Sequence, residues 1–319
     1  MTAYWIVAGG LNLDILAKPS GSFRLHDSNP GKIQERPGGV GFNIARNLAL
    51  LGQHVRFLTA SGQDRAGQFL IQAAQDKGID MSSALVSSAH ASSHYLAVHG
   101  EDGDMLVAIN DMSLFDQMTA HEVRDWIPQG QVRVGESQVC QAAFLEPNLP
   151  GEVLLSLASR WEVPLFADAV SVAKMDRLTP ILPYLTGFKV NRIEAQHLSG
   201  VQVDDPHKAL EAARRIMDRG VDMVCVSLDI QGAVFVRAGQ SVWARPVRIV
   251  HEANTTGAGD AMASAFAWAS VQGYDLLETA RLSVAASGIA VESTEAVNPA
   301  LTVELLQESA SKIEAEVIE

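Results

Sequence analysis

The chain has 319 residues, of which 47% are hydrophobic and 19% are charged. It can therefore bury a large core, and global disorder is excluded. Its 24 Lys and Arg residues against 37 Asp and Glu residues give a net charge of −13. Nucleic acid polymers and anionic membranes select basic surfaces, so this acidic balance argues against both as partners.

The first ten residues and the two cysteines indicate a protein of a reducing compartment. The first ten residues hold a short apolar run without a basic flank, so the sequence predicts no secretory signal. No window approaches the roughly 20 apolar residues that span a bilayer. Cys140 and Cys225 lie far apart without a CxxC motif, which indicates neither a disulfide framework nor a zinc knuckle. We therefore expect a cytoplasmic protein.

Strand and helix patterns alternate along most of the chain. The predicted strands cover residues 4–8, 55–60, 142–145, 165–168, 188–190, 223–227 and 233–236. The predicted helices cover residues 42–51, 67–77, 208–219, 260–271, 276–291 and 303–317. Buried strands separated by helices indicate a parallel sheet with helices on both faces, and we expect one α/β domain over residues 1–319.

Two separated segments interrupt this alternation. Residues 11–36 are rich in Ser, Pro, Gly and Asn, with brief alternating stretches. Residues 90–112 shift toward a period of two around a turn at 101–104, which predicts a hairpin. We expect the two segments to form one small antiparallel subdomain.

A glycine-rich turn before the predicted helix 260–271 is the strongest chemical signal. Gly257, Ala258 and Gly259 let the backbone approach a ligand closely, and the helix start offers free N–H groups and the positive end of its dipole. Such a turn suits a phosphate or the charge on a moving phosphoryl group. Asp260 can accept a proton from a hydroxyl nucleophile, or it can simply cap the helix.

A second glycine cluster precedes the helix at residues 42–51. Gly38 and Gly39 permit close approach to a ligand, with Asn43 in the first helical turn, or they form only a tight turn. Asn12 and Asp14 follow the first strand, at the end where α/β sheets usually bind ligands. Asp14 can accept hydrogen bonds from two sugar hydroxyls, or it is a solvated loop residue.

These motifs resemble the signatures of the ribokinase-like, or PfkB, family of small-molecule kinases. Residues 254–261 are similar to its C-terminal signature, residues 37–45 to its N-terminal glycine pair, and residues 191–194 to its Asn-x-x-Glu element. The resemblance covers nearly the whole chain. It implies a three-layer α/β/α sandwich with a mainly parallel central sheet and a small antiparallel β lid.

The resemblance also implies roles for these residues at the transfer site. Asp260 would be the general base, and the amides of Gly257, Ala258 and Gly259 would stabilise the transferring phosphoryl group. Asn43 and Asp14 would hold the hydroxyls of the acceptor. Further acceptor contacts would come from the neighbouring positions Asn12, Gly38 and Gly39.

The resemblance also implies which residues bind ATP. Asn191 and Glu194 would lie near the ATP phosphates, with Glu194 positioning Mg²⁺ through water, although the spacing also fits a capping pair. Ser227 and Gly232 would contact the nucleotide together with Gly257 and Gly259. The sequence differs from the family pattern at two positions. Asp229 stands where the family has a glycine in the nucleotide loop. Asn254 stands where the family usually has Asp, and this difference makes the K⁺ site that the family would allow a doubtful expectation.

Residues in the predicted lid resemble one group of family members more than the others. Residues 27–33, 92–96 and 103–112 are similar to those of family members that phosphorylate the 5′-hydroxyl of pseudouridine with ATP. Lys174 also fits, although Ala169 stands where a proline is usual. The polar candidates for binding the nucleoside, each of which can instead make hydrogen bonds within the lid, are Ser28, Asn29, Ser93, His94, Asn110 and Asp111.

Other readings stay open. A kinase for another nucleoside or a ribose-like sugar has the same motifs, and Asp229 leaves room for a catalytically silent nucleoside-binding protein on this fold. A dehydrogenase is disfavoured because no GxGxxG follows the first strand. The spacing of His90, His94 and His99 argues against a metal site. The resemblance implies a homodimer, with unpaired lid edges covered across a dyad.

Overall fold

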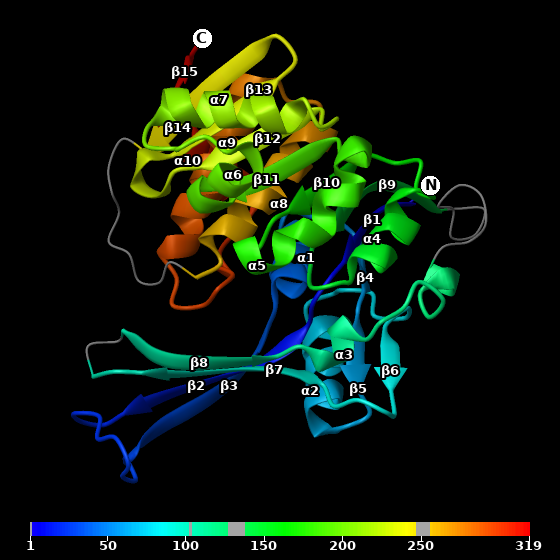
Figure 1. Cartoon of the computed structure of the whole chain (residues 1–319), viewed down its shortest axis with the longest axis vertical. Helices are drawn as coiled ribbons and strands as arrows, with labels where there is room; N and C mark the ends of the chain where they lie inside the picture. Colours follow the sequence, from blue (N-terminus) through cyan, green and yellow to red (C-terminus); the bar gives the residue numbers. More distant parts are fainter. Residues whose placement is uncertain (1, 102–103, 127–137, 247–255) are drawn as a thin grey trace.

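The computed structural model describes residues 2–101, 104–126, 138–246 and 256–319, and it is built on a large, mainly parallel sheet (Figure 1). In sheet order the nine strands are β15 (Ile313–Val317), β14 (Gln240–Pro246), β13 (Ala233–Arg237), β12 (Met223–Ser227), β11 (Gly187–Asn191), β10 (Leu165–Asp168), β9 (Gln138–Leu145), β1 (Thr2–Ala8) and β4 (Val55–Leu58). The pairings from β4 to β12 are parallel, and the three between β12 and β15 are antiparallel. The predicted fold class is confirmed.

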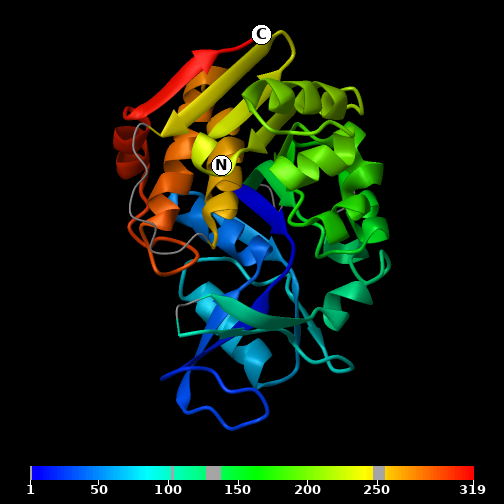
Figure 2. The same cartoon turned by 60° about the vertical axis from the view of Figure 1, so that its left-hand side comes forward.

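Helices cover both faces of this sheet (Figures 1 and 2). One face carries α4 (Gly151–Ala158), α5 (Val172–Met175), α6 (Arg192–Ser199), α7 (Pro206–Met217) and the 3₁₀ helix η2 (Asp176–Tyr184). The other carries α1 (Val40–Leu50), α8 (Ala258–Val271), α9 (Leu276–Val291) and α10 (Val303–Ala310), while α2 (Arg65–Gln75) lies beyond the edge of this sheet, beside the strands of the smaller sheets (Figure 1). Side chains alternate across each strand, so in β1 Ile6 joins one core while Trp5 and Val7 join the other.

A second sheet projects from the main body and is called the lid (Figure 1). Its order is β3 (Gly31–Gly38), β2 (Asn12–Pro19), β7 (Ser93–His99) and β8 (Met105–Asp111). The outer pairings are antiparallel, while β2 and β7 run parallel because a long connection through α1, β4 and α2 joins them. Residues 102 and 103 of the predicted hairpin turn lie outside the described residues.

Shorter elements complete the connections. A small parallel pair consists of β5 (Ala60–Gly62) and β6 (Leu85–Ser87). One helical turn, α3 (Ser113–Asp116), and two 3₁₀ turns, η1 (Arg124–Trp126) and η3 (Asp229–Gln231), lie in loops. Within the described ranges, no helix is long and apolar enough to cross a membrane.

The predicted helix over residues 303–317 is wrong in its second half. Helix α10 ends at Ala310, and β15 then pairs antiparallel with β14, with Trp243 opposite Glu316. Residues 313–317 read Ile-Glu-Ala-Glu-Val, a period-two pattern that suits an edge strand. Glu304, Glu308, Lys312 and Glu316 follow one another at four-residue steps, which is typical of a helix, but pairing with the exposed edge of β14 satisfies the backbone groups of this segment.

Candidate active site

Two helix starts meet at the carboxyl ends of the central strands. Asn43 lies in the first turn of α1 and Asp260 in the first turn of α8. Asn43 Nδ2 donates a hydrogen bond to Asp260 Oδ2 at 2.8 Å. Asn43 is buried, whereas Asp260 remains partly exposed. The predicted acceptor residue and the predicted base are therefore side by side.

The turn before α8 leaves its first amides without a side-chain cap. Gly257 is the N-cap residue, at φ 84°, and a side chain there would overlap the carbonyl oxygen of Ala296. Only glycine tolerates both constraints. Asp260 is therefore not the capping residue, and its carboxylate stays available to a ligand near the helix start.

The surroundings of Asp260 make it a weaker acid and a better base than an ordinary aspartate. Burial, together with the negative charge of Asp168, raises the pKa of Asp260 to about 7. The Asn43 hydrogen bond and the Lys189 ammonium act in the opposite direction. A base poised near neutral pH suits proton removal from an alcohol as the phosphoryl group arrives.

The predicted acceptor residues of the first glycine cluster also come together. Asn12 pairs with Gly38 in β3 and with Ser93 in β7, and its Nδ2 donates to Asp14 Oδ1. Gly39 has φ 103° and lies against the backbone of the β1–β2 turn. Burial raises the pKa of Asp14 to about 6. Ser93 Oγ is buried and has no hydrogen-bond partner among the described residues, so it can bind a ligand.

A buried polar network supports this pocket, and sequence analysis found only one member of it. Glu146 follows β9 directly and accepts hydrogen bonds from the Gly10 amide and from both the backbone and side-chain nitrogens of Asn148. Lys174 donates to Asn148 Oδ1. Burial raises the pKa of Glu146 and lowers that of Lys174. A carboxylate directly after a buried strand was the one signal that could have found Glu146.

Charged residues also gather beneath the start of α8. Lys189 Nζ and Asp168 Oδ2 form a buried ion pair at 2.9 Å. Asn191 and Glu194 form a capping box at the start of α6, in which Asn191 Oδ1 accepts from the Glu194 amide and Glu194 Oε2 from the Asn191 amide. Sequence analysis missed Lys189, because a lone lysine within an apolar strand forms no motif.

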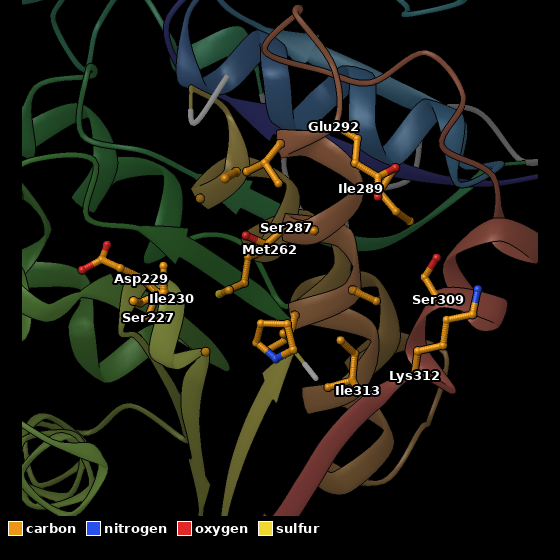
Figure 3. Close-up of a pocket in the computed structure, with 18 of the residues that line it drawn as sticks. Ser227, Asp229, Ile230, Met262, Ser287, Ile289, Glu292, Ser309, Lys312 and Ile313 are labelled. Carbon is orange, nitrogen blue, oxygen red and sulfur yellow. The ribbon is translucent and has the colours of Figure 1, made fainter. Parts of the chain in front are cut away.

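A cavity of about 840 Å³ opens beside these residues (Figure 3). Asn191, Ser227, Gly232, Ala258 and Gly259, all predicted site residues, line it together with Lys189. The opposite wall comes from the end of α9 and the α10–β15 turn, where Ser309, Lys312 and Ile313 are labelled in Figure 3. The sequence did not predict this C-terminal wall, because a continuous helix over residues 303–317 would not form the α10–β15 turn.

Asp229 lies at the rim of this cavity. Its φ of 53° explains why glycine is favoured there, and Asp is one of the few other residues that adopt this conformation readily. Its carboxylate is 84% exposed and lies 4.0 Å from Arg192 Nε. The negative charge therefore has a cation beside it and free access to water.

Three predicted nucleoside contacts lie elsewhere in the lid. Ser28 and Asn29 belong to the exposed loop between β2 and β3, where Asn29 Nδ2 donates to the carbonyls of Arg24 and Asp27. Asn110 is exposed on β8 opposite Tyr95. These contacts stay predictions. Asn254, on which the K⁺ question rests, is outside the described residues.

A helix start without a side-chain cap, a carboxyl group of raised pKa in its first turn and an adjoining cavity are features that suit phosphoryl transfer to a small molecule. The family model of pfkB family carbohydrate kinases matches residues 3–303, and the chain belongs to this family of ATP-dependent kinases.

Its relatives agree with this assignment. The chain is 32% identical to a pseudouridine kinase from Escherichia coli (strain K12), over 94% of both chains. A carbohydrate kinase from Agrobacterium tumefaciens is 26% identical and superposes with a TM-score of 0.84, covering all of both chains. A ribokinase from Arabidopsis thaliana, complexed with ribose and ATP, is 20% identical and has a TM-score of 0.81, covering 97% of this chain and 99% of its own.

Proposed function

We propose that this protein transfers the γ-phosphoryl group of ATP to the 5′-hydroxyl of pseudouridine. The observation that carries the proposal is the hydrogen bond between Asn43 and Asp260, because it joins the residue proposed to hold the acceptor to the proposed base, near the cavity. The similarity to a pseudouridine kinase over 94% of the chain supports the choice of acceptor. The product would be pseudouridine 5′-phosphate, with ADP released.

Each group has one task in this reaction. Asp14, Asn12 and Asn43 would hold the ribosyl hydroxyls, leaving the 5′-oxygen beside Asp260. As the bond between that oxygen and the γ-phosphorus forms, the bond from phosphorus to the bridging oxygen of ADP breaks, and the hydroxyl proton passes to Asp260. The first amides of α8 would stabilise the charge on the equatorial oxygens.

The residues at the nucleotide end fit Mg²⁺. Mg²⁺ beside phosphates is typically held by phosphate oxygens and water together with one or two carboxylates. The buried carboxylate of Glu194 is the residue that would hold it, with Asp168 nearby. When bound, Mg²⁺ neutralises charge on the phosphates.

We further propose that two copies pair through the lid. Strand alternation and register place Ile33, Leu96, Val107 and Ile109 on the same face of the lid, and they are 72%, 36%, 51% and 63% exposed. Asp14 points to the other face, because its neighbour Ile15 is aligned with Leu96. A second copy could therefore cover the apolar face without blocking the acceptor.

Light scattering tests this pairing. The wild-type chain should have twice the monomer mass, and Ile109→Asp should yield monomers. Val317→Asp changes an apolar position outside the lid that is at least as exposed, at 73% against 63%, and should remain dimeric. A wild-type monomer at micromolar concentration would contradict the proposal.

Rates on a set of acceptors test the proposed reaction. The value of kcat/KM should be highest for pseudouridine, by at least about tenfold over uridine, adenosine, inosine and ribose. A higher value for ribose or another nucleoside would reassign the acceptor. No ATP-dependent phosphorylation of any of them would leave a nucleoside-binding protein as the better description.

A further inference from the structure

Lys189 lies at the point where the cavity meets the start of α8. Alternation along β11 turns Phe188 and Val190 into one core and Lys189 toward α8 on the opposite face. Its side chain lines the cavity, yet only 7% of it is exposed. A Cβ built on Gly259 would lie 2.9 Å from Lys189 Nζ. The ammonium therefore occupies the space that a side chain at Gly259 would need.

The charge balance around this ammonium is unusual. Lys189 is ion-paired with Asp168, and Glu194 and Asp260 are its other acidic neighbours. These carboxylates hold the pKa of Lys189 above its usual range, so it stays protonated. This ammonium has several acidic neighbours rather than a single one, and it also borders the cavity.

We propose that Lys189 is a catalytic residue whose ammonium contacts the γ-phosphoryl group of ATP as that group moves from ADP to the acceptor. This inference rests on the proposed function. The α8 amides supply partial charges, and Lys189 adds a full positive charge from below the same turn. The glycine at position 259 is then required by the lysine as well as by the phosphate.

The test must separate this role from neutralisation of Asp168. Asp168→Asn is the reference variant, since it loses the ion pair and keeps the ammonium. Asp168→Asn with Lys189→Met removes both charges, so no carboxylate at position 168 is left unpaired. Lys189→Gln in the wild-type background keeps a donor for Asp168 and serves if the double variant fails to fold. Lys208→Met, which removes an exposed lysine paired with Glu211, is the surface control.

Two readouts decide the matter. Relative to Asp168→Asn, the double variant should lose about 10² to 10³ in kcat, with the KM for the acceptor little changed. Calorimetric titration should show affinity for ATP weakened at least about tenfold and affinity for AMP unchanged. Lys189→Gln should show the same pattern relative to wild type.

Equal kcat and equal ATP affinity in the double variant and Asp168→Asn would overturn the proposal, and so would equal losses for ATP and AMP. The titrations need no acceptor. If the wild-type chain phosphorylates none of the acceptors, the proposed function fails, while the comparison of ATP with AMP still tests the contact of Lys189 with the terminal phosphate.

Discussion

Asn43 and Asp260 are 217 positions apart in the chain, and Asn43 Nδ2 donates a 2.8 Å hydrogen bond to Asp260 Oδ2. The bond joins the first turns of α1 and α8, which pack against each other on one face of the sheet. It orients the carboxylate and also tempers the effect of burial on its pKa. The first turns of α1 and α8 are thereby held in one geometry.

Asp260→Asn should abolish most turnover while the protein stays folded. A positioned general base contributes about 10² to 10⁴ in rate, and the new amide oxygen can still accept the bond from Asn43. Because the folded pKa of Asp260 is raised to about 7, its contribution to stability is present at low pH and is lost as the pH rises through 7. The variant should therefore melt no lower than wild type at alkaline pH. A variant with near-normal kcat would remove Asp260 from its role.

Asn43→Ala should move the pH dependence of kcat to higher pH. The lost hydrogen bond is one of the interactions that lower the pKa of Asp260, so the base would titrate later and the rate near neutral pH would fall. Raising the pH should recover part of the loss. Asn47→Ala, one turn further along α1 and also buried, is the matched control and should keep the wild-type profile. The same profile in both variants would show that the bond does not tune the base.

The wild-type enzyme should gain activity with rising pH over the range set by two carboxylates. Asp14, with a pKa of about 6, must be ionised to accept hydroxyl hydrogen bonds, and Asp260, with a pKa of about 7, must be ionised to take the proton. We expect log(kcat/KM) to rise steeply below the first value and less steeply between the two. Asp14→Asn should remove only the lower ionisation. A pH-independent kcat/KM across both values would contradict the assigned roles.

Gly257→Ala should cost far more activity than a glycine substitution with equal backbone strain. Gly257 and Gly273 have φ values of 84° and 83°, but a side chain at Gly273 would meet nothing within 4 Å, whereas one at Gly257 would overlap the Ala296 carbonyl. Gly273→Ala should lower Tm by about 2 °C and leave kcat intact. Gly257→Ala should lower kcat by at least about 10² as the anion-binding turn shifts. Similar kcat values for the two variants would argue against that turn as the phosphoryl site.

Much of the fold could be predicted because its elements have strong local patterns. The bounds of β10, β12 and α9 match the predicted ranges, since each is an apolar run with clear ends. The end of the chain could not be predicted in the same way. Whether residues 313–317 form a helix or a strand depends on the free edge of β14, a partner nearly 70 residues earlier that no local pattern reveals.

The residues of the candidate site also differ in whether a local pattern could predict them. Motifs with fixed spacing revealed Gly257, Asp260 and the pair Asn191 and Glu194. Single residues on separate strands, such as Glu146 and Lys189, carry no spacing signal, and only the sheet brings them to one place. The capping box of α6 confirms the structural interpretation of Asn191 and Glu194, while their role at the nucleotide stays a proposal.

The central claim is tested most directly by identifying the product. The chain is incubated with ATP and pseudouridine, and phosphorus NMR follows the nucleotide and any new phosphomonoester. We expect one ester on the 5′-oxygen for each ADP formed, and none above background with Asp260→Asn. ATP consumption that is no faster with pseudouridine than without an acceptor, or an ester formed equally by Asp260→Asn, would contradict the account.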